Sequence, residues 1–212
     1  MGAGTDSPTG RNRSLAMTLI DLSPGDMAHR LGDALAVYVD AMRYPRGTED
    51  QRASMWLEHT RRRGWKAVAA VDDTEVPANV DDTAPTTAPL LGVAYGYCGA
   101  PDQWWQQQVV SGLRRSGADQ DHISSLMDSY FELTELHIHP RAQGRGLGEA
   151  LIRRLLEDRG EQHVLLSTPE INGEANRAWR LYRRLGFTDI IRGYHFAGDP
   201  RAFAILGRSL PL

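Results

Sequence analysis

Residues 135–148, ELHIHPRAQGRGLG, run directly into residues 149–160, EALIRRLLEDRG, and this stretch decides the fold of the chain. It predicts a short apolar strand, a turn of small residues and an amphipathic helix. Gly144, Gly146 and Gly148 lie where the turn meets the helix. Glycine lets the backbone approach a ligand closely, and the first N–H groups of a helix have no partners inside it. The junction therefore predicts a binding site for a phosphate-bearing ligand, to which Arg145 can add a positive charge.

The composition is that of an ordinary globular protein. The chain has 212 residues, of which 41% are hydrophobic and 24% charged, so a single domain is expected. Its net charge of −3 argues against a nucleic-acid partner, which would usually bind a basic surface. No apolar run reaches the roughly 18–20 residues that span a bilayer, and the N-terminus lacks the apolar segment of a secretory signal. We therefore expect a cytoplasmic protein that binds no membrane.

The chain divides into a tail and one domain. Residues 1–15 are small and polar, which predicts disorder, and residues 16–212 form the domain. Thr48 is expected to cap one helix, with Gln51 completing a capping box, and residues 72–89 are expected to form a long mobile hairpin loop. The predicted strands are residues 16–22, 65–71, 90–98, 130–139, 163–167, 187–191 and 202–206, and the predicted helices are residues 27–42, 48–63, a stretch from about 146, and 172–184. This order predicts a mixed α/β domain.

Residues 101–128 form an insertion between two neighbouring strands, which are usually joined by far fewer residues. Two helical pieces are expected within it. The insertion carries Trp104 and Trp105, which predict either a lid or part of a substrate pocket. Aromatic residues that only fix the insertion to the body of the domain are an equally good interpretation.

The strand at residues 130–139 changes its apolar phase along its length. Phe131 and Leu133 share one phase, and the apolar residues after Glu135 share the other. A strand keeps one face buried across such a change only by taking in an extra residue. We therefore predict a β-bulge near Thr134 and Glu135, which would splay the strand from its neighbour and free backbone groups for a ligand.

The spacing of the glycines argues against two common nucleotide sites. Gly144-x-Gly146-x-Gly148 is not the G-x-G-x-x-G of a dinucleotide fold, and it lies past the middle of the chain instead of after the first strand. It also lacks the Gly-Lys-Ser/Thr end of a P-loop. His137 and His139 share a strand face, but no third ligand stands at a suitable spacing, so no metal site is expected.

Two segments resemble the Gcn5-related N-acetyltransferase (GNAT) superfamily. Residues 143–148, QGRGLG, resemble its acetyl-CoA signature Q/R-x-x-G-x-G/A, and residues 176–187 resemble its N-x-A-x-x-L-Y-x-x-x-G-F segment. The resemblance implies a GNAT-like acyl-CoA N-acyltransferase fold, in which helices flank a mixed, mostly antiparallel sheet with a bulged, splayed strand. Dimers are common in that family, so a homodimer is an expectation by resemblance.

The resemblance also implies a role for each matching residue. The strand would pair through its backbone with the pantetheine arm of acetyl-CoA, the turn would wrap the pyrophosphate, and an asparagine would bond the cofactor. A tyrosine would protonate the departing thiolate, since a phenol with a pKa of about 10 keeps its proton at neutral pH. The strand residues are Leu136, His137 and Ile138, and the turn residues are Gln143, Gly144, Arg145, Gly146, Leu147 and Gly148. The asparagine is Asn176 and the tyrosine is Tyr182.

The general base is left open by the sequence. An ammonium group must lose a proton before it can attack a thioester, so a base or a water chain is needed. Glu132 and Glu135 are the candidates on the predicted bulged strand, where family members often carry a glutamate. Others carry one on the next strand, where this chain has Ser167, and Glu170 or a water remains an alternative.

Taken together, the residues and the resemblance predict an acetyl-CoA-dependent N-acetyltransferase that works by direct transfer in a ternary complex. The acceptor is expected to be a small-molecule amine, because the insertion could roof the acceptor side. The alternatives are a protein or peptide acceptor, a longer acyl-CoA, and a non-catalytic acyl-CoA-binding protein on the same fold.

Overall fold

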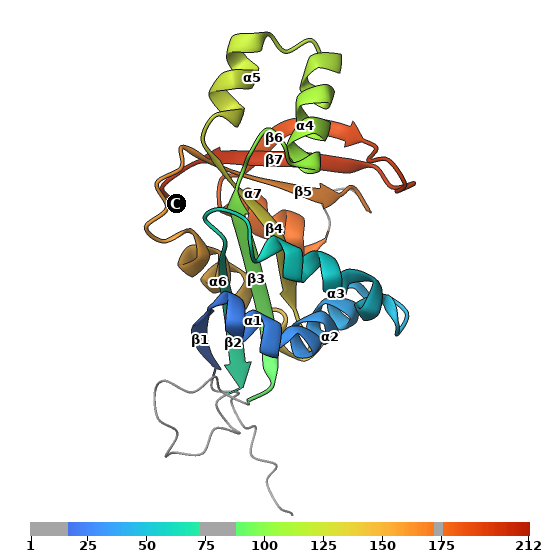
Figure 1. Ribbon diagram of the computed structural model, residues 1–212, viewed down its shortest axis with the longest axis vertical. Coiled ribbons are helices and arrows are strands. Elements are labelled where there is room, and N and C mark those ends of the chain that lie inside the picture. The colour runs from blue at the N-terminus through green and yellow to red at the C-terminus, as the bar shows by residue number, and fades with distance from the viewer. Residues whose placement is uncertain (1–16, 73–87, 172–175) are drawn as a thin grey trace, which may run out of the picture.

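The computed structural model describes residues 17–72, 88–171 and 176–212, and its centre is one seven-stranded sheet (Figure 1). The strands are β1 (Met17–Leu22), β2 (Lys66–Asp72), β3 (Leu90–Cys98), β4 (Tyr130–Ile138), β5 (His163–Pro169), β6 (Thr188–Tyr194) and β7 (Phe203–Ser209). They lie in the order β1-β2-β3-β4-β5-β7-β6. β4 and β5 pair in parallel, and the other neighbours pair antiparallel. The predicted mixed, mostly antiparallel sheet is therefore confirmed.

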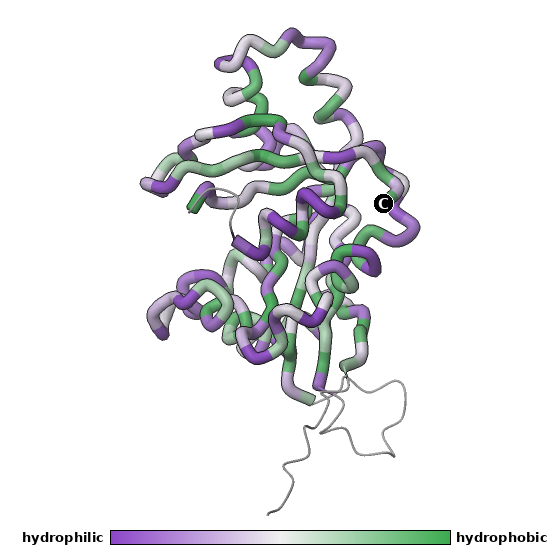
Figure 2. Tube along the Cα trace, turned by 180° about the vertical axis from the view of Figure 1, so that it is seen from behind, coloured by the Kyte–Doolittle hydropathy of each residue, from purple (hydrophilic) through white to green (hydrophobic). Residues whose placement is uncertain are grey.

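Helices cover both faces of this sheet. They are α1 (Pro24–His29), α2 (Leu31–Met42), α3 (Thr48–His59), α4 (Trp104–Arg115), α5 (Gln120–Met127), the 3-10 helix η2 (Pro140–Ala142), α6 (Leu147–Leu156) and α7 (Arg177–Arg184). α6 and α7 bury residues such as Leu151 and Trp179 against one face. On the other face α2 and α3 cover the β1–β4 part, and α4 and α5 pack over β5, β7 and β6 (Figure 1). In Figure 2 the helices alternate green and purple along their length, as amphipathic helices should.

The predicted single helix over residues 27–42 is wrong, because the structure breaks it at Arg30 into α1 and α2. Arg30 is only 7% exposed, and its guanidinium donates to the carbonyl of Ala88 (2.7 Å) and to Asp33 (2.9 Å). α1 begins at Pro24, with Ser23 as its capping residue. A buried arginine that needs acceptors thus overrides the helical period.

The predicted Thr48–Gln51 capping box is also wrong. α3 begins at Thr48 itself, so Gly47, with φ of 95°, is the capping residue. The N–H of Gly47 donates to the carboxylate of Glu49 (2.7 Å), and the Thr48 hydroxyl donates back to the carbonyl of Pro45 (2.7 Å). The expected disordered tail, most of the expected hairpin loop and the start of the expected 172–184 helix lie outside the described residues.

The predicted bulge is present in β4. Tyr95 of β3 pairs with Glu135 but Gly96 pairs with Leu133, so Thr134 is the extra residue. β4 and β5 pair over only three positions, which end at Glu132, and the two strands separate beyond the bulge. The edge of β4 that faces β5 is therefore left without a strand partner in the described part of the chain.

The bulge also changes which side chains share a face. Glu132 and Glu135 are three residues apart and would point to opposite faces of a regular strand. Their partners on β3, Tyr97 and Tyr95, are two residues apart and point to the same face. Both glutamates therefore lie on the face of the sheet that carries α2 and α3.

Candidate active site

A cleft of about 1140 Å³ opens where β4 and β5 separate. It is lined from the bulge of β4, through the turn before α6, to α7 and the β6–β7 connection. Eleven of the thirteen residues predicted for the site line it: Glu135, Leu136, His137, Ile138, Gln143, Gly144, Gly146, Leu147, Gly148, Asn176 and Tyr182. Glu132 and Arg145 are not among its lining residues. Their predicted roles, like those of the other eleven, remain predictions.

The turn before α6 has the backbone that a phosphate site needs. Gly144 and Gly146 have φ of +81° and +79°, a region in which a side chain would be strained. Gly146 caps α6 with no side-chain hydrogen bond to the helix. Within the described part of the chain, the five N–H groups of residues 144–148 donate no hydrogen bond. This row of free donors at a helix N-terminus fits the pyrophosphate of acetyl-CoA.

Gly148 brings the next helix close to that turn. A Cβ added there would lie 2.9 Å from Leu181 Cδ2 of α7. At the start of α7, Asn176 accepts a hydrogen bond from the N–H of Trp179 (2.9 Å) through its side-chain oxygen. The Arg177 guanidinium donates to the amide oxygen of Gln143 (3.0 Å), whose own amide donates to the carbonyl of Ile138 (3.0 Å). β4, the turn and α7 are thus joined around the cleft.

Tyr182 of α7 is the predicted acid. Its side chain is 7% exposed, lines the cleft and packs against Phe187, with 5.6 Å between the ring centroids. Burial, together with the negative charge of Glu135, raises the pKa of the Tyr182 hydroxyl above its usual value of 10. The hydroxyl therefore keeps its proton at neutral pH, as a proton donor must.

Glu135 lies in the cleft and is held in place by His137. The Glu135 carboxylate and the His137 Nε2 are 2.5 Å apart. The imidazole is enclosed by aromatic rings. Tyr38 meets it edge-on, with 4.9 Å between the ring centroids, and Trp56 stacks on it, with 6.4 Å between the centroids. The Glu135 side chain keeps 15% of its surface exposed, so that a cleft ligand can reach it.

Glu132 has a different environment from Glu135. It is only 4% exposed, and one of its carboxylate oxygens, Oε2, has no hydrogen-bond partner. Burial raises the pKa of this carboxyl to about 8, although the Arg62 charge and the Tyr97 hydroxyl act in the opposite direction. At neutral pH the group is therefore mostly protonated, and it is not among the residues that line the cleft.

The inserted helix α4 contributes to the other end of the cleft. Trp104 is 52% exposed and lies 5.5 Å from Phe196 between ring centroids, and both residues line the cleft. Trp105 is buried, and its indole N–H donates to Ser167 of β5 (3.4 Å). Trp105 therefore fixes α4 to the sheet and Trp104 lies in the lining of the cleft, while a lid or substrate-pocket role for the insertion stays a prediction.

Three groups missed by the sequence also lie at this site. Arg201, in the β6–β7 connection, binds Asp199 through both carboxylate oxygens and donates to the Tyr44 hydroxyl (3.0 Å) after α2. All three line the cleft. The Arg201–Tyr44 contact joins residues 157 positions apart, so no local pattern could have indicated it. Over the described residues, no group of three metal-ligating side chains and no helix able to cross a membrane is found.

The cleft, the glycine turn before α6 and the bulged strand are the features expected of an acyl-CoA-dependent transferase, and the sequence comparisons agree. Residues 102–189 match the model of the acetyltransferase (GNAT) domain. The chain is 73% identical over 206 residues to a GCN5-like protein acetyltransferase of Mycobacterium tuberculosis, covering 93% of this chain and 100% of that protein. The chain therefore belongs to the GNAT acetyltransferase family, which uses acetyl-CoA, and the predicted resemblance is confirmed.

Solved structures share the fold at low sequence identity. A putative GNAT-family acetyltransferase from Desulfovibrio desulfuricans superposes with a TM-score of 0.57 at 16% identity, over 92% of this chain and 99% of that one. A putative acetyltransferase from Salmonella typhimurium, solved with its cofactor acetyl-CoA, gives a TM-score of 0.55 at 15% identity, over 93% and 95%. These likenesses confirm the predicted GNAT fold.

Proposed function

We propose that this chain transfers the acetyl group of acetyl-CoA to an amino group of a protein, by direct attack in a ternary complex. The observation that carries the transfer is the cleft, where the free N–H groups of the turn, Glu135 and Tyr182 line one continuous space. The protein acceptor is supported by 73% identity, across its whole length, to a relative named a protein acetyltransferase.

The turn and β4 would hold the donor. The free N–H groups of residues 144–148 bind the pyrophosphate, and the unpaired edge of β4 beyond the bulge offers backbone groups to the pantetheine arm. When bound, acetyl-CoA supplies an activated thioester. Tyr182 then gives its phenol proton to the thiolate sulfur as the acetyl group leaves.

Glu135 is the base that we propose. It lines the cleft and His137 fixes its orientation, so its carboxylate can take a proton from the acceptor ammonium, directly or through one water. Glu132 is buried outside the lining and is mostly protonated at neutral pH, since its pKa is about 8. That environment favours Glu135 over Glu132 as the group that receives the proton.

Acetyl transfer from acetyl-CoA to purified acceptor proteins, followed by thiol release and mass spectrometry, tests this function. We expect Tyr182→Phe and Glu135→Gln each to lower kcat by about 100-fold or more, the usual contribution of a positioned acid or base. Calorimetry should give nearly unchanged acetyl-CoA affinities for both variants. Full turnover by Tyr182→Phe at every pH would exclude the acid role, and acetyl-CoA binding without transfer to any amine would favour a non-catalytic binding protein.

A small-molecule amine is a second candidate acceptor. It is favoured by α4, which brings Trp104 to the acceptor end of the cleft and leaves less room there for a protein chain. A panel of small primary amines in the same assay separates the two candidates. Acetylation of small amines with no transfer to any protein would replace the first proposal by the second.

A further inference from the structure

Three arginines of α7 line the cleft on the side of the phosphate turn. Arg177, Arg180 and Arg184 are spaced by three and four residues, so they follow one side of the helix. All three are exposed at the surface. Neither the motif residues nor the proposed transfer chemistry assigns them a role.

Arg177 lies directly beside the turn. Its guanidinium donates to the neutral amide of Gln143 (3.0 Å), and one of its nitrogens lies 3.9 Å from the place that a Cβ on Gly144 would take. Within the described residues no carboxylate pairs with Arg177. Its charge is therefore available to an anion at the turn.

Arg184 provides the contrast on the same helix. Its guanidinium donates twice to one carboxylate oxygen of Glu149 (3.1 and 3.2 Å). Its guanidinium is thus paired with a carboxylate, which Arg153 of α6 also binds. Arg177, at the end of α7 nearest the turn, has no such carboxylate partner among the described residues.

Backbone donors at the turn suffice for the pyrophosphate. Five consecutive N–H groups and the positive end of α6 would meet the two phosphates of the pyrophosphate, which carry one negative charge each. CoA carries a third phosphate, on the 3′-oxygen of its ribose, whose charge approaches −2 at neutral pH. A guanidinium fork matches such a monoester phosphate in both charge and shape.

We propose that Arg177 binds the 3′-phosphate of CoA and makes the chain select CoA over 3′-dephospho-CoA. This inference rests on acetyl-CoA as the donor. It adds a specificity determinant that lies outside the family motifs, on the exposed side of α7.

Titration calorimetry with CoA and with 3′-dephospho-CoA tests the proposal without any acceptor. We expect the wild type to prefer CoA, and Arg177→Ala to bind CoA about tenfold more weakly while its affinity for 3′-dephospho-CoA changes by less than about twofold. Arg177→Lys keeps the charge but not the planar fork of the guanidinium. Its affinity for CoA should therefore lie between those of the wild type and Arg177→Ala. Arg184→Ala is the matched control and should change both affinities by the same factor.

Two results would overturn the proposal while leaving acetyl-CoA as the donor. One is equal affinity of the wild type for the two ligands. The other is an equal loss of both affinities in Arg177→Ala, which would place this side chain on the pyrophosphate. A wild type that binds neither ligand would overturn the proposed function as well. Because Arg177 is exposed at the first position of α7, an unchanged melting temperature is expected and shows that Arg177→Ala is folded.

Discussion

Glu132 and Glu135 show at the scale of single residues how one strand gives two carboxyl groups different chemistry. The bulge at Thr134 turns both toward the same face of the sheet. Only Glu135 reaches the cleft, where His137 binds it, whereas Glu132 is enclosed with an unpartnered oxygen. Two carboxyl groups on one strand therefore differ in their chemistry because their surroundings differ, as in other acid–base sites. The sequence supplied both candidates, but their burial depends on aromatic residues from β3 that no local pattern indicates.

The raised pKa of Glu132 makes the stability of the protein depend on pH. In the unfolded chain the carboxyl ionises near its ordinary pKa of 4.5, but in the folded protein near 8. Below pH 4.5 the carboxyl group is protonated in both the folded and the unfolded protein. Between the two values the unfolded state loses its proton first, so the free energy of unfolding falls as pH rises, by about 1.4 kcal/mol for each pH unit at most.

Glu132→Gln removes this titration and nearly keeps the shape of the side chain. We expect the wild type to lose a few kcal/mol more stability than Glu132→Gln between about pH 5 and pH 8, measured by urea unfolding at both values. The comparison cancels the other titrating groups, including buried His59, whose pKa is lowered to about 4 by burial. Parallel stability curves for the two proteins would show that Glu132 is ionised in the folded state at low pH.

At the scale of elements, the turn into α6 was the most predictable part of the site. Its glycines are required by backbone geometry that is local in sequence, with positive φ at Gly144 and Gly146. The bulge was predictable for a similar reason, since a change of apolar phase is visible in a single strand. The break at Arg30 was not, because it depends on the distant carbonyl of Ala88.

Gly146→Ala tests the role of backbone strain at this turn. A Cβ at Gly146 meets no atom within 4 Å, so the only penalty is its φ of +79°. We expect the free energy of unfolding to fall by about 1–2 kcal/mol and acetyl-CoA affinity to fall with it, as the N–H groups turn away. Gly160→Ala is the matched control, because that site is also open but has no positive φ. Equal stability of the two variants would show that the turn tolerates a side chain.

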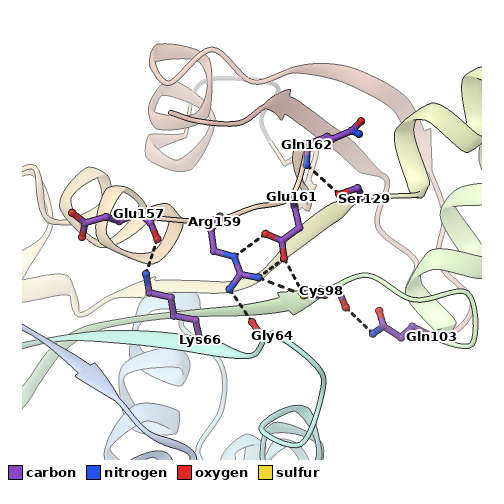
Figure 3. A network of polar contacts seen from close by, with 9 residues as sticks. All are labelled: Gly64, Lys66, Cys98, Gln103, Ser129, Glu157, Arg159, Glu161 and Gln162. Carbon is purple, nitrogen blue, oxygen red and sulfur yellow. Dashed lines mark hydrogen bonds and ion pairs between the residues drawn. The ribbon is translucent and has the colours of Figure 1, made fainter.

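At the scale of the whole molecule, the sheet is divided by the separation of β4 and β5, and polar contacts join its two parts at both ends. Figure 3 shows the closed end, where Arg159 donates to the carbonyl of Gly64 (3.0 Å) and binds Glu161. Cys98 also donates to Glu161 (2.9 Å), and Lys66 donates to the carbonyl of Glu157 (3.0 Å). These contacts fix the ends of β2 and β3 to the segment between α6 and β5.

At the open end, Arg201 of the β6–β7 connection donates to the Tyr44 hydroxyl, and both residues line the cleft. Separation along the chain explains why the sequence predicted one side of the cleft and not the other. The predicted side is built from residues 130–187, where motif residues are close in the chain. The other side is assembled from the α2–α3 connection, α4 and the β6–β7 connection, whose contacts span most of the sequence.

Tyr44→Phe tests whether the Arg201–Tyr44 contact holds the acceptor end together. The substitution removes one hydroxyl that accepts from a charged guanidinium, an interaction worth about 1–3 kcal/mol, while Asp199 keeps Arg201 paired. We expect faster amide hydrogen exchange at residues 43–47 and 195–202, with acetyl-CoA affinity unchanged, because the turn and α7 are not touched. Tyr130→Phe is the control, since it loses a hydrogen bond of the same length, to Gln106, away from this contact. Unchanged exchange in Tyr44→Phe, or the same increase in Tyr130→Phe, would mean that the two sides of the cleft are positioned independently of this contact.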